Sequence, residues 1–236
     1  MPRLFVDVSS DDTDRATVDA DGVRHLRALR LGPGDGLEAI VGPGEVRLAT
    51  IETLGKRGAK LRLGESVHLG AVDPGRPLIL AVGLADFSRF DSVVEKATEL
   101  GATHIVPLRT ARTQIGKLTD SRRQRWHRIA RAACEQCGRT QPPEISAEIG
   151  LDDVRAHLPK PSHRVVLSPN GERQWDGETG DQQPLVLFVG PEGGFTTEEV
   201  QALCRDGAHA RTLGPRILRF ETAAAAALAI AGTRRP

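Results

Sequence analysis

The chain has 236 residues, of which 39% are apolar and 27% are charged, and its formal net charge is +1. This composition is typical of a globular protein and excludes a largely disordered chain, and the lack of an 18-residue apolar run excludes a membrane-spanning helix. Three cysteines exclude a disulfide framework, and an aromatic content of 3% without tyrosine disfavours a base-stacking surface. Because the N-terminus lacks a signal-peptide pattern, we expect a cytoplasmic protein.

Short strand-like runs separated by glycine turns make up the first third of the chain. Strands are predicted over 3–8, 36–41, 45–54 and 60–63. One helical turn is expected over 23–29, and the series of short strands indicates a small β-barrel. A Pro/Gly-rich connector at 71–77 marks a boundary, so we expect one domain over 1–73 and a second over 74–236.

Strands and helices alternate after this boundary, which is the pattern of an α/β domain. Apolar runs predict strands over 78–84, 104–108, 164–167, 185–189 and 210–213. Helices are predicted over 91–100, 121–137, 152–157, 198–205 and 221–231. The polar, glycine-containing segment 170–183 is expected to be an exposed loop. We therefore predict a mostly parallel sheet with helices on both faces.

Basic side chains are concentrated in two segments of this near-neutral chain. Residues 109–139 contain nine Lys/Arg against two acidic residues, and residues 211–236 contain five against one, whereas residues 1–73 contain ten against twelve. Concentrated positive charge suits contact with phosphate groups. For segment 109–139 alone, a solvated helix face explains the charges equally well.

Two glycine-punctuated segments near the C-terminus carry the strongest functional signal. GPEGGF at 190–195 follows the apolar run 185–189 directly, and LGPRILRFETA at 213–223 leads into a helix of small residues. Ligands bind at strand ends in α/β sheets, and glycine lets the backbone approach a ligand closely. Phosphate binding is the rival interpretation, but both glycine-rich phosphate-binding patterns are missing, and Glu192 would repel a polyphosphate.

Five motifs in order resemble those of the RsmE family of 16S ribosomal RNA methyltransferases. They are RHLRALR at 24–30 with a following Gly-Asp, EKATELG at 95–101, ACEQCGR at 133–139, and the two glycine-containing segments. The resemblance covers essentially the whole chain. It implies a SPOUT-class α/β domain with a C-terminal trefoil knot, preceded by a PUA-like β-barrel that binds RNA.

The resemblance also implies an activity. Members of the family use S-adenosyl-L-methionine to methylate N3 of a uridine in 16S rRNA of the 30S subunit, and they work as homodimers. We expect the same here, with no membrane and no metal involved. Two alternatives stay open: a SPOUT enzyme acting on tRNA or 23S rRNA, and a non-catalytic RNA-binding protein on the same scaffold.

The cofactor site is assigned from the glycine-containing segments and the end of the strand before them. Its expected residues are Leu167, Gly190, Pro191, Glu192, Gly193, Gly194, Leu213, Gly214, Ile217, Leu218 and Thr222. Leu213, Ile217 and Leu218 are expected to sandwich an adenine while backbone groups read its edge.

Arg219 and Glu221 are the candidate catalytic residues. Removal of the uridine N3 proton creates negative charge, which a cation beside the uracil oxygens would stabilise. Arg219 is the candidate cation, and Glu221 is the candidate proton acceptor or the partner that positions Arg219. A phosphate clamp explains Arg219 equally well, and a favourable helix-dipole contact explains Glu221 equally well.

Six arginines are candidate RNA contacts: Arg3, Arg24, Arg27, Arg30, Arg112 and Arg139. The three at 24, 27 and 30 are expected on one side of a helical turn, with Leu26 and Leu29 on another. The resemblance links Arg3 and Arg112 to RNA contact.

Cys134 and Cys137 form a Cys-x-x-Cys pair within the predicted helix 121–137. Such a pair raises redox activity or zinc binding as alternatives. Because no second pair and no histidine at a usual ligand spacing accompanies it, we expect neither.

Overall fold

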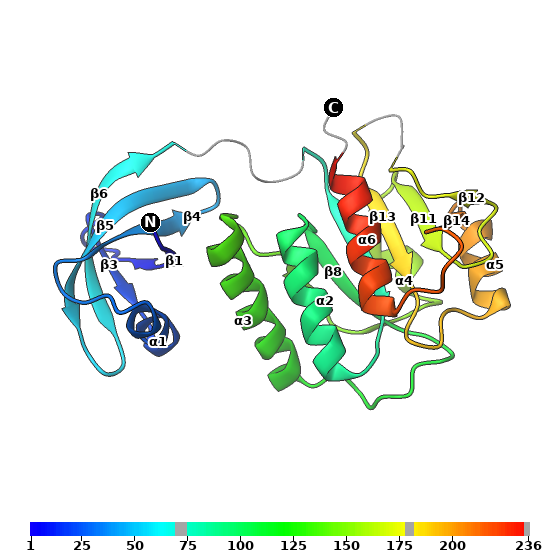
Figure 1. The fold of residues 1–236 in the computed structure, drawn as a ribbon, viewed down its shortest axis with the longest axis horizontal. Helices are drawn as coiled ribbons and strands as arrows, with labels where there is room; N and C mark the ends of the chain where they lie inside the picture. The colour runs from blue at the N-terminus through cyan, green and yellow to red at the C-terminus, as the bar shows by residue number, and fades with distance from the viewer. Residues whose placement is uncertain (69–74, 178–181, 234–236) are drawn as a thin grey trace. The chain divides into compact units, whose positions relative to one another are not determined.

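The computed structural model describes residues 1–68, 75–177 and 182–233, and the chain divides into two compact units (Figure 1). The first unit comprises Met1–Val72 together with Cys134–Gln141, and the second comprises Asp73–Ala133 and Pro142–Pro236. A segment from the middle of the sequence therefore completes the first unit. The domain boundary expected between residues 73 and 74 lies outside the described residues.

Six strands form a curled sheet in the first unit. They are β1 (Arg3–Phe5), β2 (Asp7–Val8), β3 (Arg15–Val18), β4 (Gly36–Gly42), β5 (Glu45–Leu54) and β6 (Ala59–Val67). The strand order is β1-β4-β5-β6-β3-β2, in which β1 and β4 are parallel and the other pairs are antiparallel. One residue separates β1 from β2, yet they lie at opposite ends of this order, so the sheet curls back on itself like a small barrel.

The helix α1 (Ala20–Ala28) packs on this sheet. Its buried Val23 and Leu26 share one core with Leu37 and Leu61 of the strands. Leu29, which is expected on the same side as Leu26, is 45% exposed, whereas Leu26 is buried. The physical reason is that the helix ends at Ala28 and that Arg30 adopts a left-handed conformation with φ of 59°.

Strand β3 was not predicted. It has four residues, and its exposed Arg15 and Thr17 alternate with buried Ala16 and Val18. Two small apolar residues in a charged segment produce too weak an alternation to be recognised in the sequence.

Eight strands form the sheet of the second unit. They are β7 (Leu78–Gly83), β8 (His104–Arg109), β9 (Glu144–Ile145), β10 (Ile149–Gly150), β11 (His163–Leu167), β12 (Arg173–Gln174), β13 (Leu185–Val189) and β14 (His209–Thr212). Their order is β10-β8-β7-β13-β11-β14-β12, β9 pairs with β8, and all the pairs are parallel. The predicted parallel α/β sheet is confirmed.

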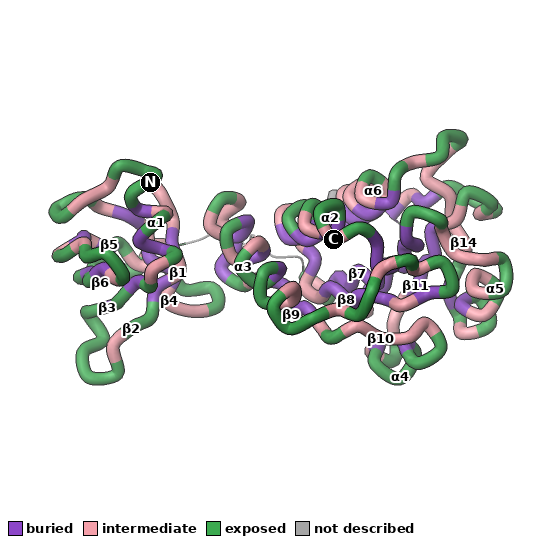
Figure 2. Tube along the Cα trace, turned by 90° about the horizontal axis from the view of Figure 1, so that it is seen from below, coloured by how far each residue is buried: buried purple, intermediate pink, exposed green. Residues whose placement is uncertain are grey.

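Helices cover both faces of this sheet. They are α2 (Phe87–Glu99), α3 (Asp120–Cys137), α4 (Val154–His157), α5 (Thr197–Arg205) and α6 (Phe220–Thr233). Side chains of β7 alternate between two cores: Leu78, Leu80 and Val82 pack with α2, α3 and α6, whereas Ile79 and Ala81 pack with α4 and α5. The central strands are therefore buried on both faces, as the burial colouring of Figure 2 shows for β7 and β8.

Helix α2 begins earlier than expected, at Phe87 instead of residue 91. Asp86 is its N-cap, and its carboxylate accepts hydrogen bonds from the backbone N–H groups of Ser88 at 3.0 Å and Arg89 at 3.3 Å. The cap adds a first turn, which brings Asp86 and Arg89 to the end of the helix nearest the carboxyl end of β7.

The expectation of an exposed loop over 170–183 is only partly correct for its described residues: Asn170, Glu172 and Gln182 are exposed, but Arg173–Gln174 form β12. Trp175 is only 3% exposed and belongs to the core beneath α6. Its indole N–H donates to the carbonyl of Ala227 at 3.2 Å, and its backbone N–H donates to Thr212 at 2.8 Å. One tryptophan among polar residues thus anchors the segment, because burying an indole removes a large apolar area from water.

Two glycines let the same segment lie against the C-terminal part of the chain. A Cβ at Gly171 would lie 2.3 Å from the carbonyl carbon of Arg211, and a Cβ at Gly177 would lie 2.6 Å from the carbonyl oxygen of Ile230. Residues 171–177 therefore pack closely over β14 and α6. Only glycine permits these backbone approaches.

Candidate functional site

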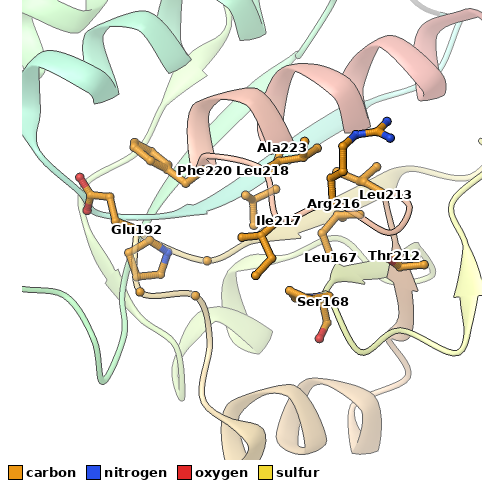
Figure 3. A pocket seen from close by; sticks show the side chains of 16 residues that line it. Leu167, Ser168, Glu192, Thr212, Leu213, Arg216, Ile217, Leu218, Phe220 and Ala223 are labelled. Atoms are coloured by element: carbon orange, nitrogen blue, oxygen red, sulfur yellow. The ribbon is translucent and has the colours of Figure 1, made fainter.

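A pocket lies at the carboxyl ends of three neighbouring strands of the second unit, β11, β13 and β14 (Figure 3). Its volume is about 280 Å³. The lining residues are Leu167, Ser168, Pro169, Val189, Gly190, Pro191, Glu192, Gly193, Gly194, Thr212, Leu213, Arg216, Ile217, Leu218, Phe220 and Ala223. The carboxyl ends of parallel strands are where α/β folds bind ligands, so this pocket is the candidate functional site.

The loop 190–195 forms one wall through a tight turn. The backbone N–H of Gly194 donates to the carbonyl of Pro191 at 2.7 Å, and Gly194 has a positive φ of 71°. A Cβ at Gly190 would lie 2.7 Å from the backbone nitrogen of Phe195. A Cβ at Gly83 would lie 2.4 Å from Pro191. The wall of the pocket is therefore backbone that only glycine allows to close this tightly.

Glu192 is the acidic residue of this wall, and its carboxylate is held from outside the loop. It accepts a hydrogen bond from the backbone N–H of Asp86 at 3.2 Å and lies 3.8 Å from the guanidinium of Arg89. Both partners belong to the start of α2. The carboxylate of Glu192 therefore points toward the start of α2 and away from the other side chains that line the pocket (Figure 3).

The opposite wall comes from the segment between β14 and α6. Gly214 adopts φ of 107° and donates to the hydroxyl of Thr212 at 3.2 Å, which turns the chain at the strand end. Leu213 lies within this turn, Ile217 and Leu218 follow it, and all three line the pocket. Ile217 is 88% exposed, so the mouth carries an apolar side chain that no described residue covers.

The structure brings together most of the residues assigned from the sequence to the cofactor site. Nine of those eleven line the pocket, whereas Gly214 and the exposed Thr222 do not. The sequence-based assignment missed Ser168, Pro169, Val189, Thr212, Arg216, Phe220 and Ala223. All seven lie within two residues of a residue that was assigned from the sequence. Extending each assigned segment by two residues in both directions would have included them.

The two candidate catalytic residues lie next to the pocket and do not line it. Arg219 is exposed, and its backbone carbonyl accepts from Ala223 at 2.8 Å, so it precedes the first turn of α6. Oε2 of Glu221 is buried without a hydrogen-bond partner among the described residues. A buried carboxylate oxygen left without a donor costs about 1–3 kcal/mol.

The candidate RNA contacts in the first unit differ in their exposure. Arg24, Arg27 and Arg30 are exposed, although Arg24 pairs with Asp21 and Arg27 donates to the carbonyl of Gly55. Arg3 is mostly buried between Glu38, at 2.6 Å, and the carbonyl of Gly138, at 2.7 Å.

Arg139 is 3% exposed, which contradicts a surface role. A side chain this buried has no access to an RNA backbone. The basic charge of the 133–139 motif was visible in the sequence, but its burial was not.

Many charges of the basic segment 109–139 are already paired within the second unit. The pairs are Arg109 with Glu148 at 2.9 Å, Arg123 with Asp120 at 3.2 Å, and Arg125 with Asp91 at 2.9 Å. The hydrogen bond from Arg109 holds the pKa of Glu148 below its usual value, with a further contribution from the backbone N–H of Leu118. Burial, followed by the charge of Arg123, lowers the pKa of His127. The positive charge of the segment is therefore partly compensated within the unit.

Cys134 is buried and Cys137 is half-buried, both as free thiols. The described part of the chain contains no group of three or more His, Cys, Asp or Glu side chains arranged to hold a metal ion. Within the same residues, no helix combines the length and apolar character needed to cross a membrane.

Comparison with known proteins gives two matching family models, an RNA methyltransferase domain over residues 73–232 and an RNA methyltransferase PUA domain over residues 18–64. Ribosomal RNA small subunit methyltransferase E of Mycobacterium bovis is 32% identical over 97% of this chain and 90% of its own length. The Bacillus subtilis protein of the same name is 26% identical over 94% and 93%.

A solved structure of ribosomal RNA small subunit methyltransferase E from Neisseria gonorrhoeae, bound to S-adenosyl methionine, has the same fold. It superimposes with a TM-score of 0.86 at 31% identity and covers 97% of this chain and 95% of its own. The family model over residues 73–232 contains the whole pocket, and the relatives span nearly the full chain. The chain therefore belongs to the family of ribosomal RNA small subunit methyltransferases E.

Proposed function

We propose that this protein transfers the methyl group of S-adenosylmethionine to N3 of a uridine in 16S rRNA of the small ribosomal subunit. The observation that carries the proposal is the pocket at the strand ends, whose walls are the two glycine-containing segments that resemble the family's motifs. Family membership supplies the class of cofactor and of substrate. The pocket supplies a place for the cofactor within the second unit.

The residues present fit this cofactor. Leu213 and Leu218 offer an apolar slot for a flat base, and the glycine turn at Gly190 lets backbone groups reach its polar edge. An acidic residue in this loop, Glu192, is compatible with a positively charged sulfonium and unfavourable for a polyphosphate. Bound there, S-adenosylmethionine supplies an electrophilic methyl group.

The protein's own residues bind the uridine, remove its N3 proton and stabilise the negative charge that results. We assign Glu221 to accept the N3 proton at Oε2, the oxygen that lacks a donor among the described residues. We assign Arg219 to stabilise the negative charge that develops on the uracil oxygens. Because Arg219 is exposed beside the pocket, an incoming base is able to reach its guanidinium.

The remaining parts of the proposal follow the family. The domain over 1–73 contacts RNA through the exposed Arg24, Arg27 and Arg30, and the domain over 74–236 carries the chemistry. We propose that the protein acts as a homodimer in the cytoplasm. We also propose that the C-terminal chain is knotted, which the close packing of residues 171–177 over β14 and α6 supports.

The test in cells is a comparison of ribosomal RNA with and without this gene. Mass-spectrometric mapping of methylated uridines should reveal one N3-methyluridine in 16S rRNA that disappears with the gene and returns with a plasmid copy. An unchanged 16S rRNA together with a lost methyl group in tRNA or 23S rRNA would reject this substrate.

A further inference from the structure

We propose that Arg112 and Glu199 are positioning residues that hold the loop 190–195 in its cofactor-binding conformation. The inference rests on the proposed function, because it takes this loop as one wall of the S-adenosylmethionine site. It replaces RNA contact, which the resemblance implies for Arg112, with a role inside the second unit.

Arg112 holds the loop by its carbonyl oxygens. Its Nη1 donates to the carbonyl of Gly193 and, at 3.4 Å, to the carbonyl of Phe195. The stem of the side chain lies directly over Gly193, where an added Cβ would be 3.2 Å from Cδ of Arg112. The guanidinium of Arg112 thus binds both carbonyl groups and fixes their orientation relative to each other.

Fixing these carbonyls also fixes the N–H groups of the loop. A carbonyl and the N–H of the following residue share one rigid peptide plane. When Arg112 orients the carbonyl of Gly193, it therefore orients the N–H of Gly194, which donates to Pro191 at 2.7 Å. Two adjacent glycines have wide conformational freedom, so a loop without this support would lose more entropy on binding a ligand.

Glu199 fixes the turn that carries Arg112. Its carboxylate accepts a hydrogen bond from the backbone N–H of Ala111 at 2.7 Å through Oε1. Its other oxygen accepts from the backbone N–H of Thr196 at 2.8 Å, and the N–H of Glu199 donates back to the Thr196 hydroxyl at 3.2 Å. The carboxylate of one capping box therefore joins the start of α5 to the turn after β8.

The turn after β8 is closed by its own hydrogen bonds as well. The backbone N–H of Thr110 donates to the hydroxyl of Thr113 at 3.0 Å, and the N–H of Thr113 donates to the carbonyl of Thr110 at 3.1 Å. Arg112 therefore extends from a rigid turn. The loop 190–195 is therefore held at two points: Arg112 binds the carbonyl of Gly193, and the start of α2 binds the carboxylate of Glu192.

The test compares Arg112→Met, which keeps the stem and removes the donors, with Arg112→Lys, which keeps one cationic donor. Glu199→Gln leaves one acceptor oxygen for two backbone donors, the N–H groups of Ala111 and Thr196. Glu45→Gln is the matched control for the loss of one carboxylate, because Glu45 is exposed on β5 of the first unit. Glu198 is unsuitable as a control, since it interacts electrostatically with Arg112. Each full-length variant is measured for cofactor affinity by calorimetry, for affinity to 30S subunits by filter binding, and for melting temperature without cofactor.

Arg112→Met should weaken binding of S-adenosylmethionine about tenfold and leave 30S affinity and the cofactor-free melting temperature nearly unchanged. Arg112→Lys should recover part of the loss, Glu199→Gln should resemble Arg112→Met, and Glu45→Gln should bind like the wild type. The methylation rate at saturating cofactor should stay close to normal, so the apparent KM rises and kcat does not fall in proportion.

Cofactor affinity equal to the wild type in Arg112→Met, with or without a loss of 30S affinity, would overturn the positioning role. If Arg112→Met does not fold, Arg112→Lys and Glu199→Gln carry the same comparison, and wild-type affinity in both overturns the inference. A wild-type protein that does not bind S-adenosylmethionine would instead reject the proposed function, so the two failures are distinguishable.

Discussion

At the scale of single residues, the pocket depends on positions where a side chain cannot be accommodated. Gly190 is one of these, because an added Cβ would lie 2.7 Å from the nitrogen of Phe195 and 2.8 Å from the carbonyl carbon of Gly194. Both neighbours are backbone atoms, so the clash cannot be relieved by a side-chain rotation. The loop itself has to move.

Gly190→Ala should therefore weaken S-adenosylmethionine binding at least tenfold in calorimetry. The matched control is Gly116→Ala, because an added Cβ at Gly116 has no neighbour within 4 Å. The control should bind like the wild type. Equal affinities for the two variants would show that the loop geometry does not determine cofactor binding.

Arg219 separates catalysis from binding. If it stabilises the uracil anion, Arg219→Ala should reduce the single-turnover methylation rate about 100-fold and leave cofactor affinity within a few-fold. Arg219→Lys should retain little of the rate, because one ammonium does not reproduce the planar guanidinium. A normal single-turnover rate combined with weak RNA binding would make Arg219 a phosphate clamp and remove it from the catalytic residues.

At the scale of elements, the segment 171–177 depends on one buried indole. Trp175→Ala should lower the free energy of unfolding by about 3–5 kcal/mol, the usual cost of truncating a large buried aromatic side chain. Trp175→Phe should cost less, since it keeps most of the apolar area and loses the hydrogen bond to Ala227. Denaturant unfolding measures both, and a wild-type stability for Trp175→Ala would mean that the segment is not anchored there.

Elements with a strong local pattern were predictable from the sequence. The five-residue apolar run at Leu185–Val189 is a strand buried on both faces, and the helix predicted over 198–205 is present as α5 with a capping box formed by Thr196 and Glu199. By contrast, β3 and Trp175 were not recognised, because a four-residue strand and one tryptophan in a polar segment have no periodicity. Their positions depend on contacts with residues distant in the sequence.

The site likewise contains features that the sequence predicted and features that it did not. Glycines that follow a strand predicted its walls, since glycine marks close backbone approach locally. The roles of Arg112 and Arg139 were not readable, because one depends on a loop 81 residues away and the other on burial in the folded unit. Charge is visible in a sequence, whereas the partner that neutralises it is not.

At the scale of the whole molecule, the first unit is discontinuous in sequence. Within it, Arg3 donates to the carbonyl of Gly138, the N–H of Phe5 donates to Glu135 at 3.1 Å, and the N–H of Gly44 donates to Thr140 at 2.8 Å. These contacts attach residues 134–141 to the curled sheet. The proposed domain over 1–73 therefore lacks part of its own structure when it is separated from the rest of the chain.

A fragment of residues 1–73 should accordingly melt at a lower temperature than a fragment that carries residues 134–141 on a flexible linker. Circular dichroism of the two fragments measures the difference. The linked fragment with Glu135→Ala and Thr140→Ala is the control for these contacts, and it should melt like the short fragment. Equal melting temperatures for all three would mean that residues 134–141 do not stabilise the sheet.

The central claim is that this protein methylates N3 of a uridine in small-subunit rRNA with S-adenosylmethionine. The most direct measurement is methyl transfer in vitro, with purified protein, S-adenosylmethionine labelled in its methyl group, and 30S subunits from cells that lack the gene. After nuclease digestion, the account predicts label in one nucleoside, N3-methyluridine, at one position of 16S rRNA. Label in a different nucleoside, or no transfer to 30S subunits or to their free RNA, would contradict it.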